Sequence, residues 1–396
     1  MEKNMKKVMV LGAGVMQVPL IKKIREMGHY ALVVGIKGNY PGIPLASRCE
    51  FLDFNETDKV IELGRREKID AVLTCGIDMP VKTMACVAEA LSLPGISAMA
   101  GRCTTDKMLM KECFQKYGVR TARFIKCESL EDGVEAFRQL NEPVMFKTID
   151  GQGSNGITKV SDESQIQYAY DAIKKFSRTN KYIVEEFIEG EEIGAQAFVL
   201  NGEIQFVLPH GDYVFQGDTG VPLGHYVPAG FSDAIVHDCR KQLELCVKAM
   251  GLSTCAVNAD FILHDGEIYV LEIAGRCGAT MLAETVSIYY GFNYYEKMVQ
   301  AVLGEKVDFT PCGNMTPNAT MTLYSEKDGR ILSQKNNNTI GGDVVEVRFD
   351  HEVGDAVRKF RHGIDRLGHV IVKGTTLQEA QANLNRVLKN IEINVG

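Results

Sequence analysis

The sequence predicts an α/β protein, and three of its stretches support this prediction. Residues 1–97 alternate strand-like and helix-like runs, residues 143–160 place a glycine-rich loop between two short strands, and residues 256–273 contain two adjacent strands. Alternation of this kind is typical of sheets covered by helices. At 396 residues, the chain is long enough for two or three domains with well-filled cores.

The charge balance is mildly negative, because 44 Lys and Arg oppose 51 Asp and Glu to give −7. This balance argues against a general nucleic-acid-binding protein and leaves room for local basic sites. The first apolar run, residues 8–11, is too short for a secretory signal or a membrane span. We therefore expect a cytoplasmic protein with neither membrane nor nucleic-acid partners.

Cysteine and histidine are plentiful but not clustered in the sequence. None of the 11 cysteines forms a C-x-x-C pair, so we expect them to be reduced packing residues. The eight histidines show no H-x-x-x-H spacing and no Cys/His cluster, which argues against a structural zinc site.

The first 97 residues predict a parallel, doubly wound α/β domain. Its first turn, "GAGVMQ", has Gly12 and Gly14 but Gln17 where a dinucleotide fingerprint has its third glycine. Asp53 also comes later than the acidic residue of that fingerprint should. A nicotinamide cofactor is therefore poorly supported, and a small anionic ligand or simple turn geometry is favoured. Strands are expected at 8–11, 31–34 and 71–73, and helices at 17–27, 57–66 and 81–91.

The rest of the chain predicts two further domains. We place the boundaries at 1–97, 98–310 and 311–396, with a lid subdomain at about 120–185 in the middle domain. The C-terminal lobe is expected to have several short strands and a final helix at 376–390. In the middle domain we expect a Thr-capped helix at 104–118, strands at 193–200 and 204–208, a loop at 209–230, a helix at 232–250, and strands at 256–263 and 267–273.

Residues 151–156, "GQGSNG", spell the G-x-G-x-x-G of a dinucleotide-binding turn. That motif needs a strand before it and a helix after it. The apolar run 143–147 supplies the strand, but 157–160 alternates apolar and polar residues and predicts a second strand. A helix begins only near Ser161, which could serve as its N-cap. The stretch therefore predicts a hairpin flap, either one whose backbone N–H groups cover a phosphate or an ordinary glycine-rich hairpin.

Four elements then follow one another in a fixed order. Lys107 lies near a helix start, Lys147 lies on the strand before the flap, and "VEEFIEGEE" spans 184–192. The hairpin "NADFILHDGEIYVLEIAGR" places Asp260 and Glu272 on its two strands. In this order and spacing the sequence resembles the ATP-grasp superfamily, specifically its carboxylate–amine ligases of the L-amino-acid ligase type. The resemblance covers essentially the whole chain and implies an N-terminal α/β domain, a central ATP-grasp domain with a glycine-rich flap, and a small C-terminal α+β lobe.

The resemblance also implies an ATP site. Two lysines suit the phosphates of ATP as point charges, although an isolated lysine is more often a solvated surface charge. Glu186, Glu189 and Glu191 are typical of a solvated face. The implied contacts are Lys107 and Lys147 on the α- and β-phosphates, Gly151, Gly153, Ser154 and Gly156 over the β- and γ-phosphates, Glu185 on the adenine amino group, backbone groups of Phe187 and Ile188 on the ring edge, and Glu192 on the ribose.

The metal ligands depart from the family pattern at one position. Asp260 and Glu272 on paired strands would share Mg²⁺, or Mn²⁺, as hard oxygen ligands, and burying them unpaired between strands would be costly. The family usually has Glu-x-Asn, but Ala274 stands in the Asn place. Water or Asn258, which lies on the same strand face as Asp260, would replace the missing amide. Loss of a ligand also fits a non-catalytic ATP sensor, although both lysines, the flap and both acids are retained.

Arg276 follows on a glycine-bearing turn, and its planar fork suits a carboxylate or an acyl phosphate. The resemblance implies that it stabilises developing negative charge, and the alternative is a structural salt bridge. The loop 209–230, with His210, Asp212 and His225, is expected to line the acceptor pocket.

The predicted function is an ATP-dependent ligase that joins a small carboxylate to an amine through an acyl phosphate, releasing ADP and phosphate. Both substrates are expected to resemble amino acids, and the family implies a homodimer. The segment "RLGHVIVKGTTLQEAQANLNRVLKNI" also resembles the closing lobe of amino-acid ligases and of purine-pathway ATP-grasp enzymes. Three alternatives stay open: a purine-type enzyme that activates bicarbonate or formate, an ATP sensor, and a Rossmann oxidoreductase.

Overall fold

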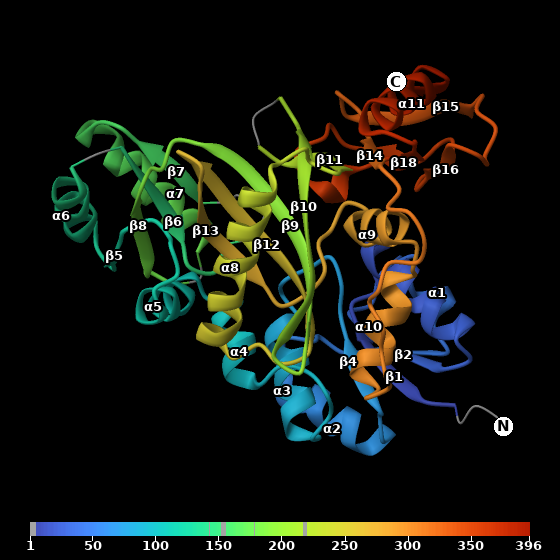
Figure 1. The fold of residues 1–396 in the computed structure, drawn as a ribbon, viewed down its shortest axis with the longest axis horizontal. Coiled ribbons are helices and arrows are strands. Elements are labelled where there is room, and N and C mark those ends of the chain that lie inside the picture. The colour runs from blue at the N-terminus through green and yellow to red at the C-terminus, as the bar shows by residue number, and fades with distance from the viewer. Residues whose placement is uncertain (1–4, 142, 152–155, 178, 217–219) are drawn as a thin grey trace. The chain divides into compact units, whose positions relative to one another are not determined.

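The computed structural model describes residues 5–141, 143–151, 156–177, 179–216 and 220–396 (Figure 1). The chain forms two compact units. Unit 1 comprises residues 1–207, 232–277 and 295–308, and unit 2 comprises 208–231, 278–294 and 309–396. Within the described ranges, no helix is both long and apolar enough to cross a membrane. All 11 cysteines are free thiols.

Unit 1 begins with a four-stranded parallel sheet, as predicted. The strand order is β3-β2-β1-β4, and Figure 1 shows the strands in blue beside their helices. The central strands are almost completely buried, which is expected of a parallel sheet covered by helices. The elements are β1 (Lys7–Leu11), α1 (Val18–Glu26), β2 (Tyr30–Gly35), β3 (Arg48–Phe51), α2 (Thr57–Glu67), β4 (Ala71–Leu73) and α3 (Val81–Ala90).

The turn after β1 explains why glutamine stands at position 17, where a dinucleotide fingerprint has glycine. Gly12 has a φ of +105°, which favours glycine. The Gln17 side chain folds back into the turn, where its Oε1 accepts a hydrogen bond from the Gly14 N–H at 2.9 Å. Its Nε2 donates to the Cys75 carbonyl at 2.6 Å. Turn geometry alone therefore accounts for this glycine pair and the buried glutamine.

The helix expected at 104–118 is confirmed as α5 (Lys107–Tyr117), and a short helix, α4 (Ala98–Cys103), precedes it. The prediction of a Thr cap was wrong, because Asp106 caps α5 by accepting hydrogen bonds from the N–H groups of Met108 and Leu109. The hydroxyls of Thr104 and Thr105 instead donate backwards to the Gly101 carbonyl, at the end of α4.

The second sheet of unit 1 is antiparallel and contains the glycine hairpin. Its order is β5-β8-β6-β7, with helices α6 and α7 packed against it. Lys147 is paired with Ile157 across β6 and β7, which confirms the predicted strand–loop–strand arrangement. Asp162, not Ser161, caps the helical turn that follows, because its side chain accepts from the Ser164 N–H. The elements are β5 (Phe124–Cys127), α6 (Leu130–Leu140), β6 (Val144–Thr148), β7 (Ile157–Val160), α7 (Ile166–Phe176) and β8 (Tyr182–Glu186).

The third sheet of unit 1 contains the predicted acidic hairpin. Strands β13 (Glu267–Ala274), β12 (Cys255–His264) and β9 (Glu191–Leu200) are neighbours in that order, and β10 (Glu203–Val214) follows β9. Pairing is antiparallel across β9, β12 and β13. The long helix α8 (Asp233–Met250) agrees with the prediction and packs on β13. The last helix of this unit is α10 (Tyr294–Val302).

In unit 2, the described residues of the predicted loop 209–230 include parts of two strands. Strand β10 continues to Val214 and pairs antiparallel with β11 (Pro222–Val227). The glycines suggested a loop, but Gly211 is paired with Tyr226 across β10 and β11. Glycine suits this strand position because a Cβ there would lie 2.1 Å from the Tyr226 ring. The predicted final helix is confirmed as α11 (Leu377–Lys389), capped by Thr376. The remaining elements are α9 (Leu282–Tyr290), β14 (Asn318–Leu323), β15 (Gly329–Asn336), β16 (Val344–Phe349), β17 (Ala356–Val357), β18 (Gly368–Lys373) and β19 (Ile391–Val395).

Candidate active site

The most buried ionic cluster of the candidate site is a carboxylate held between two lysines. Glu185 of β8 lies 2.7 Å from Lys147 Nζ of β6 and 3.0 Å from Lys111 Nζ of α5. The side chains of Glu185 and Lys111 are each only 2% exposed. Lys111 also donates to the Thr121 hydroxyl at 2.5 Å. The structure therefore brings the predicted residues Lys147 and Glu185 into one ion pair, and it places a further lysine, Lys111, in the same cluster.

Sequence reasoning missed Lys111, although one signal was available. Lys107 and Lys111 are four residues apart, so they lie on the same face of a helix. Burial lowers the pKa of Lys111, and this effect outweighs the nearby Glu185, which raises it. The pKa of Glu185 moves the other way: burial raises it, but Lys111 and Lys147 lower it by more, to about 2 from an ordinary 4.5.

This shift predicts a specific loss of stability in acid. A carboxylate whose folded-state pKa is depressed stabilises the fold above its unfolded pKa and loses that contribution as pH falls through the folded value. The Glu185 contribution should therefore be complete above pH 4.5 and should fade between pH 4.5 and 2. Urea unfolding from pH 7 to 2.5 would measure it, with Glu185→Gln as the reference. The stability gap between the two proteins should shrink below pH 4.5, and a gap independent of pH would contradict the assignment.

The first residue of α5 connects two parts of the site. The Lys107 N–H donates to the Ile149 carbonyl at 3.1 Å, just after β6, and Lys107 Nζ lies 2.5 Å from Glu272 Oε2 on β13. Burial lowers the pKa of Lys107, but the carboxylates of Glu272, Asp78 and Glu185 raise it by more, so the ammonium form is favoured. Helix α5 thus links the base of the glycine hairpin to the strand of a predicted metal ligand.

The predicted metal ligands lie together on β12 and β13. Asp260 is directly opposite Glu272, and Asn258 is directly opposite Ala274. Asn258 Nδ2 donates to Asp260 Oδ1 at 3.2 Å, and its Oδ1 accepts from Gln196 Nε2 at 2.6 Å. These oxygens are the ligand type that Mg²⁺ prefers. Neither carboxylate is buried, since Asp260 is exposed and the Glu272 side chain is 36% exposed.

Arg276 follows β13 and forms an ion pair that sequence reasoning did not identify. Its Nε and one terminal nitrogen each lie 2.7 Å from Asp78 Oδ1, and its other terminal nitrogen donates to the Cys277 carbonyl at 3.2 Å. Burial lowers the pKa of Arg276, but Asp78 raises it by more, so the guanidinium stays charged. Asp78 comes soon after β4, where a parallel sheet commonly places functional side chains. Asp78 is therefore the partner in the structural salt bridge that was the alternative role for Arg276.

The predicted nucleotide contacts lie near β8 and β9. The Phe187 N–H donates to the Pro143 carbonyl at 2.8 Å, so its own carbonyl is the better candidate for a base contact. Ile188 is half-buried, and Glu192 is exposed at the start of β9. Whether any of them contacts a nucleotide stays a prediction.

The described ends of the glycine hairpin are Gly151 and Gly156. Gly156 has a φ of +72°, and a Cβ there would lie 2.5 Å from Thr148 Cγ2, so this position requires glycine. Gly153 and Ser154, predicted to cover phosphates, lie outside the described residues. Their role stays a prediction.

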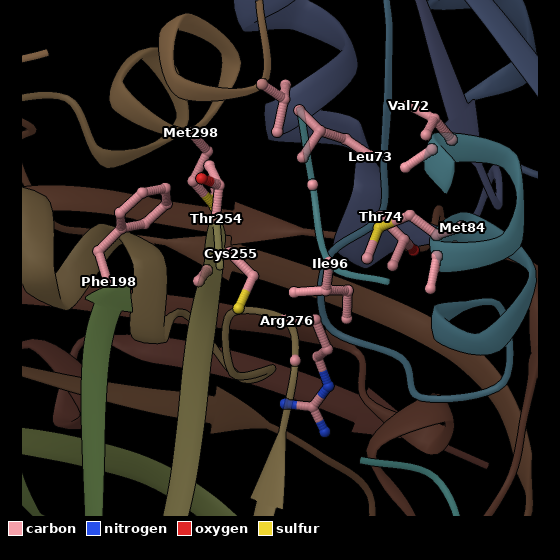
Figure 2. Close-up of a pocket in the computed structure, with 16 residues that line it drawn as sticks. Val72, Leu73, Thr74, Met84, Ile96, Phe198, Thr254, Cys255, Arg276 and Met298 are labelled. Carbon is pink, nitrogen blue, oxygen red and sulfur yellow. The ribbon is translucent and has the colours of Figure 1, made fainter. Parts of the chain in front are cut away.

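A cavity lies behind the Arg276 turn, between α3, β4, β12 and α10. In Figure 2 the guanidinium points away from the apolar side chains of this cavity. The lining is mostly apolar, and its polar side chains include Thr74, Thr254 and Arg276. The lining residues are Val72, Leu73, Thr74, Met84, Ala85, Ala88, Gly95, Ile96, Phe198, Thr254, Cys255, Ala256, Gly275, Arg276, Met298 and Val302.

Two family models match the chain. Residues 105–280 match the phosphoribosylglycinamide synthetase ATP-grasp (A) domain, which covers α5, the glycine hairpin, the acidic hairpin and Arg276. Residues 321–396 match the L-amino acid ligase C-terminal domain 2. Both descriptions agree with the resemblance that the motif order implied.

Individual relatives match between 82% and 100% of the chain. A phosphoribosylglycinamide synthetase from Anaerococcus prevotii is 32% identical, with a TM-score of 0.86, over 99% of this chain and 100% of that one. An L-amino acid ligase from Bacillus licheniformis has the same fold, with a TM-score of 0.83 at 18% identity and full coverage of both chains. A formate-dependent phosphoribosylglycinamide formyltransferase from Methanococcus maripaludis is 27% identical over 82% of each chain. The chain therefore belongs to the ATP-grasp superfamily, and it is a ligase that forms carbon–nitrogen bonds.

Proposed function

We propose that this ligase joins a small, amino-acid-like carboxylate to an amine through an acyl phosphate. A substrate carboxylate oxygen attacks the γ-phosphorus of ATP, giving an acyl phosphate and ADP. The amine then attacks the acyl carbon, loses a proton, and displaces phosphate to form an amide. The observation that supports this best is the set of paired charges in unit 1, where Lys107 meets Glu272 and Lys147 meets Glu185.

Each charged group has a role in this proposal. Lys107 and Lys147 bind the phosphates of ATP, and the glycine hairpin covers them and keeps water from the acyl phosphate. Glu185, the Phe187 and Ile188 backbones, and Glu192 bind the nucleoside. Arg276 stabilises the negative charge that develops during phosphoryl transfer and amine attack.

The oxygen ligands fit a magnesium ion. Asp260 and Glu272 face each other on paired strands, and Asn258 is within hydrogen-bond distance of Asp260, in the place opposite Ala274. These three residues would hold Mg²⁺, or Mn²⁺, as ligands. A metal ion bound there would supply positive charge that offsets the negative charge of the transferring phosphoryl group.

Replacing Asp260 by asparagine should raise the Mg²⁺ concentration needed for half-maximal activity by about 10- to 100-fold. The reason is that a neutral amide replaces a charged ligand with little change in shape. Activity measured against Mg²⁺ at saturating ATP would test this. Asp265→Asn is a matched control, since Asp265 lies at the turn of the same hairpin with a 91% exposed side chain. An unchanged Mg²⁺ requirement in Asp260→Asn would remove this residue from the metal site.

Phosphate release from MgATP is the experiment that tests the function itself. Single amino acids and then pairs would be supplied to the purified chain. Release that needs two amino acids together supports the proposal, and mass spectrometry of the product would name the bond. Tight ATP binding with no release from any substrate would favour the sensor alternative that Ala274 suggests.

A second candidate is favoured by the 32% identical relative and by the match over residues 105–280. Both concern phosphoribosylglycinamide synthetase, so a purine-type reaction belongs in the same assay. Glycine with phosphoribosylamine, and phosphoribosylglycinamide with formate or bicarbonate, are the substrates to add. Phosphate release with one of these substrates, and none with pairs of amino acids, would support the purine-type reaction. A homodimer and a cytoplasmic location remain predictions for either function.

A further inference from the structure

Three side chains of types that can bind a metal ion lie together in unit 2. They belong to the segment that the sequence suggested was a loop. Asp212 Oδ1 lies 2.8 Å from His210 Nδ1 and 2.6 Å from His225 Nδ1. The two imidazole rings are 4.8 Å apart between centroids and nearly perpendicular. One ligand atom from each residue can be chosen so that all three lie within 4.8 Å of one another.

Strand geometry explains why these residues meet. His210 and Asp212 are two residues apart on β10, so their side chains lie on the same face. Asp212 is directly paired with His225 on β11. The His225 N–H also donates to the Thr320 hydroxyl of β14 at 3.0 Å, and a Cβ on Gly224 would lie 2.0 Å from the Thr320 carbonyl oxygen. The backbone around the cluster is therefore closely packed, and the cluster is positioned by three strands.

The charge balance of the cluster is unusual for a buried site. Both histidine side chains are 3% exposed, whereas the Asp212 side chain is 25% exposed. Among the described residues, its ion-pair partners are these two histidines, not a lysine or an arginine. A cation bound there would balance the charge of this carboxylate.

We propose that His210, Asp212 and His225 bind one divalent transition-metal ion of the zinc, cobalt or nickel class. Two imidazoles and one carboxylate are a common ligand set for such ions, whereas Mg²⁺ prefers oxygen ligands alone. With metal–ligand bonds of about 2.0–2.2 Å, tetrahedral ligands lie about 3.3 Å apart. Each histidine nitrogen would therefore move about 0.5–0.7 Å away from Asp212, and the two ligand atoms that lie farthest apart, at up to 4.8 Å, would approach each other by up to about 1.5 Å. The partly exposed carboxylate gives the ion a route in, and the open position would hold water or another ligand.

The ligands of this site come from other strands than those of the Mg²⁺ site proposed for Asp260, Glu272 and Asn258. Its test therefore does not depend on the ligase reaction. The full chain, stripped with EDTA and desalted without nucleotide, would be titrated with Co²⁺ while visible absorption and heat are recorded. We expect one Co²⁺ per chain, the absorption of a low-coordinate site, and displacement by Zn²⁺ but not by Mg²⁺.

Three substitutions locate the ion. Asp212→Asn, His210→Gln and His225→Gln should each weaken Co²⁺ binding about 100-fold or more. His237→Gln, on the exposed face of α8, and Asp260→Asn should leave it unchanged. Binding that persists in all three ligand variants, or wild-type protein that takes up no Co²⁺ at millimolar concentration, would overturn the proposal.

A measurement on the unaltered chain covers the case in which a variant does not fold. X-ray absorption of the Zn²⁺-loaded wild-type protein should show two imidazoles and only nitrogen or oxygen ligands at about 2.0–2.1 Å. Sulfur ligation would place the ion among the cysteines, and a single imidazole would exclude this cluster.

Discussion

Replacing Lys147 by alanine should lower ATP-dependent phosphate release by about 10²- to 10³-fold. Lys147 lies on β6 at the base of the glycine hairpin, and its side chain is only 13% exposed. A positive charge positioned in a largely water-excluded site stabilises phosphate charge far more than a surface lysine does. The substitution removes this charge without disturbing the β6–β7 pairing, and steady-state phosphate release would measure the loss.

Lys126→Ala is the matched control for this variant. Lys126 lies on β5 in the same sheet, but it is exposed and pairs with the exposed Glu112. Its loss should leave turnover within about twofold, because exposed pairs contribute little. Equal turnover in wild type and Lys147→Ala would remove Lys147 from the phosphate site and weaken the whole ligase proposal.

Replacing Glu185 by glutamine should lower the free energy of unfolding by about 3–5 kcal/mol. Glu185 is the only negative charge among three buried groups, since Lys111 and Lys147 both lie within 3.0 Å of it. A neutral amide would leave two ammonium groups buried side by side without the carboxylate that balances them. Urea unfolding at pH 7, without nucleotide, would measure the loss.

Two further variants separate charge from other effects of that substitution. Glu186→Gln changes the neighbouring acid, which pairs with the exposed Arg123, and should cost less than about 1 kcal/mol. Adding Lys111→Met to Glu185→Gln removes one of the two repelling charges and should restore part of the lost stability. A double variant less stable than Glu185→Gln would show that packing, and not charge, dominates this cluster.

Local sequence signals predicted most of the fold. The parallel strands of unit 1, the β6–β7 hairpin and α8 all have strong hydrophobic periodicity, so their positions could be predicted closely. The helix start at Asp106 was missed because Thr104, Thr105 and Asp106 are all good capping residues. Only the structure shows that the hydroxyls of the two threonines donate hydrogen bonds to the preceding Gly101 carbonyl.

Contacts distant in sequence limited the prediction of the site. The acids on β12 and β13 could be placed opposite each other, since a short turn fixes their pairing. Lys111 and Asp78 could not be assigned in this way, because their partners lie on separate elements. The His210–Asp212–His225 cluster was missed for a related reason: its spacing depends on the β10–β11 register, which glycine-rich strands specify weakly.

The double attachment of Lys107 also has a consequence for engineering this enzyme. Its backbone holds the end of β6 through Ile149, while its side chain holds Glu272 on β13. Substitutions in the first turn of α5 should therefore be epistatic with changes at both of these places, since neighbours that share a partner do not act additively. A mutant library designed to change substrate choice should vary these three segments together, because the best residue in one will depend on the other two.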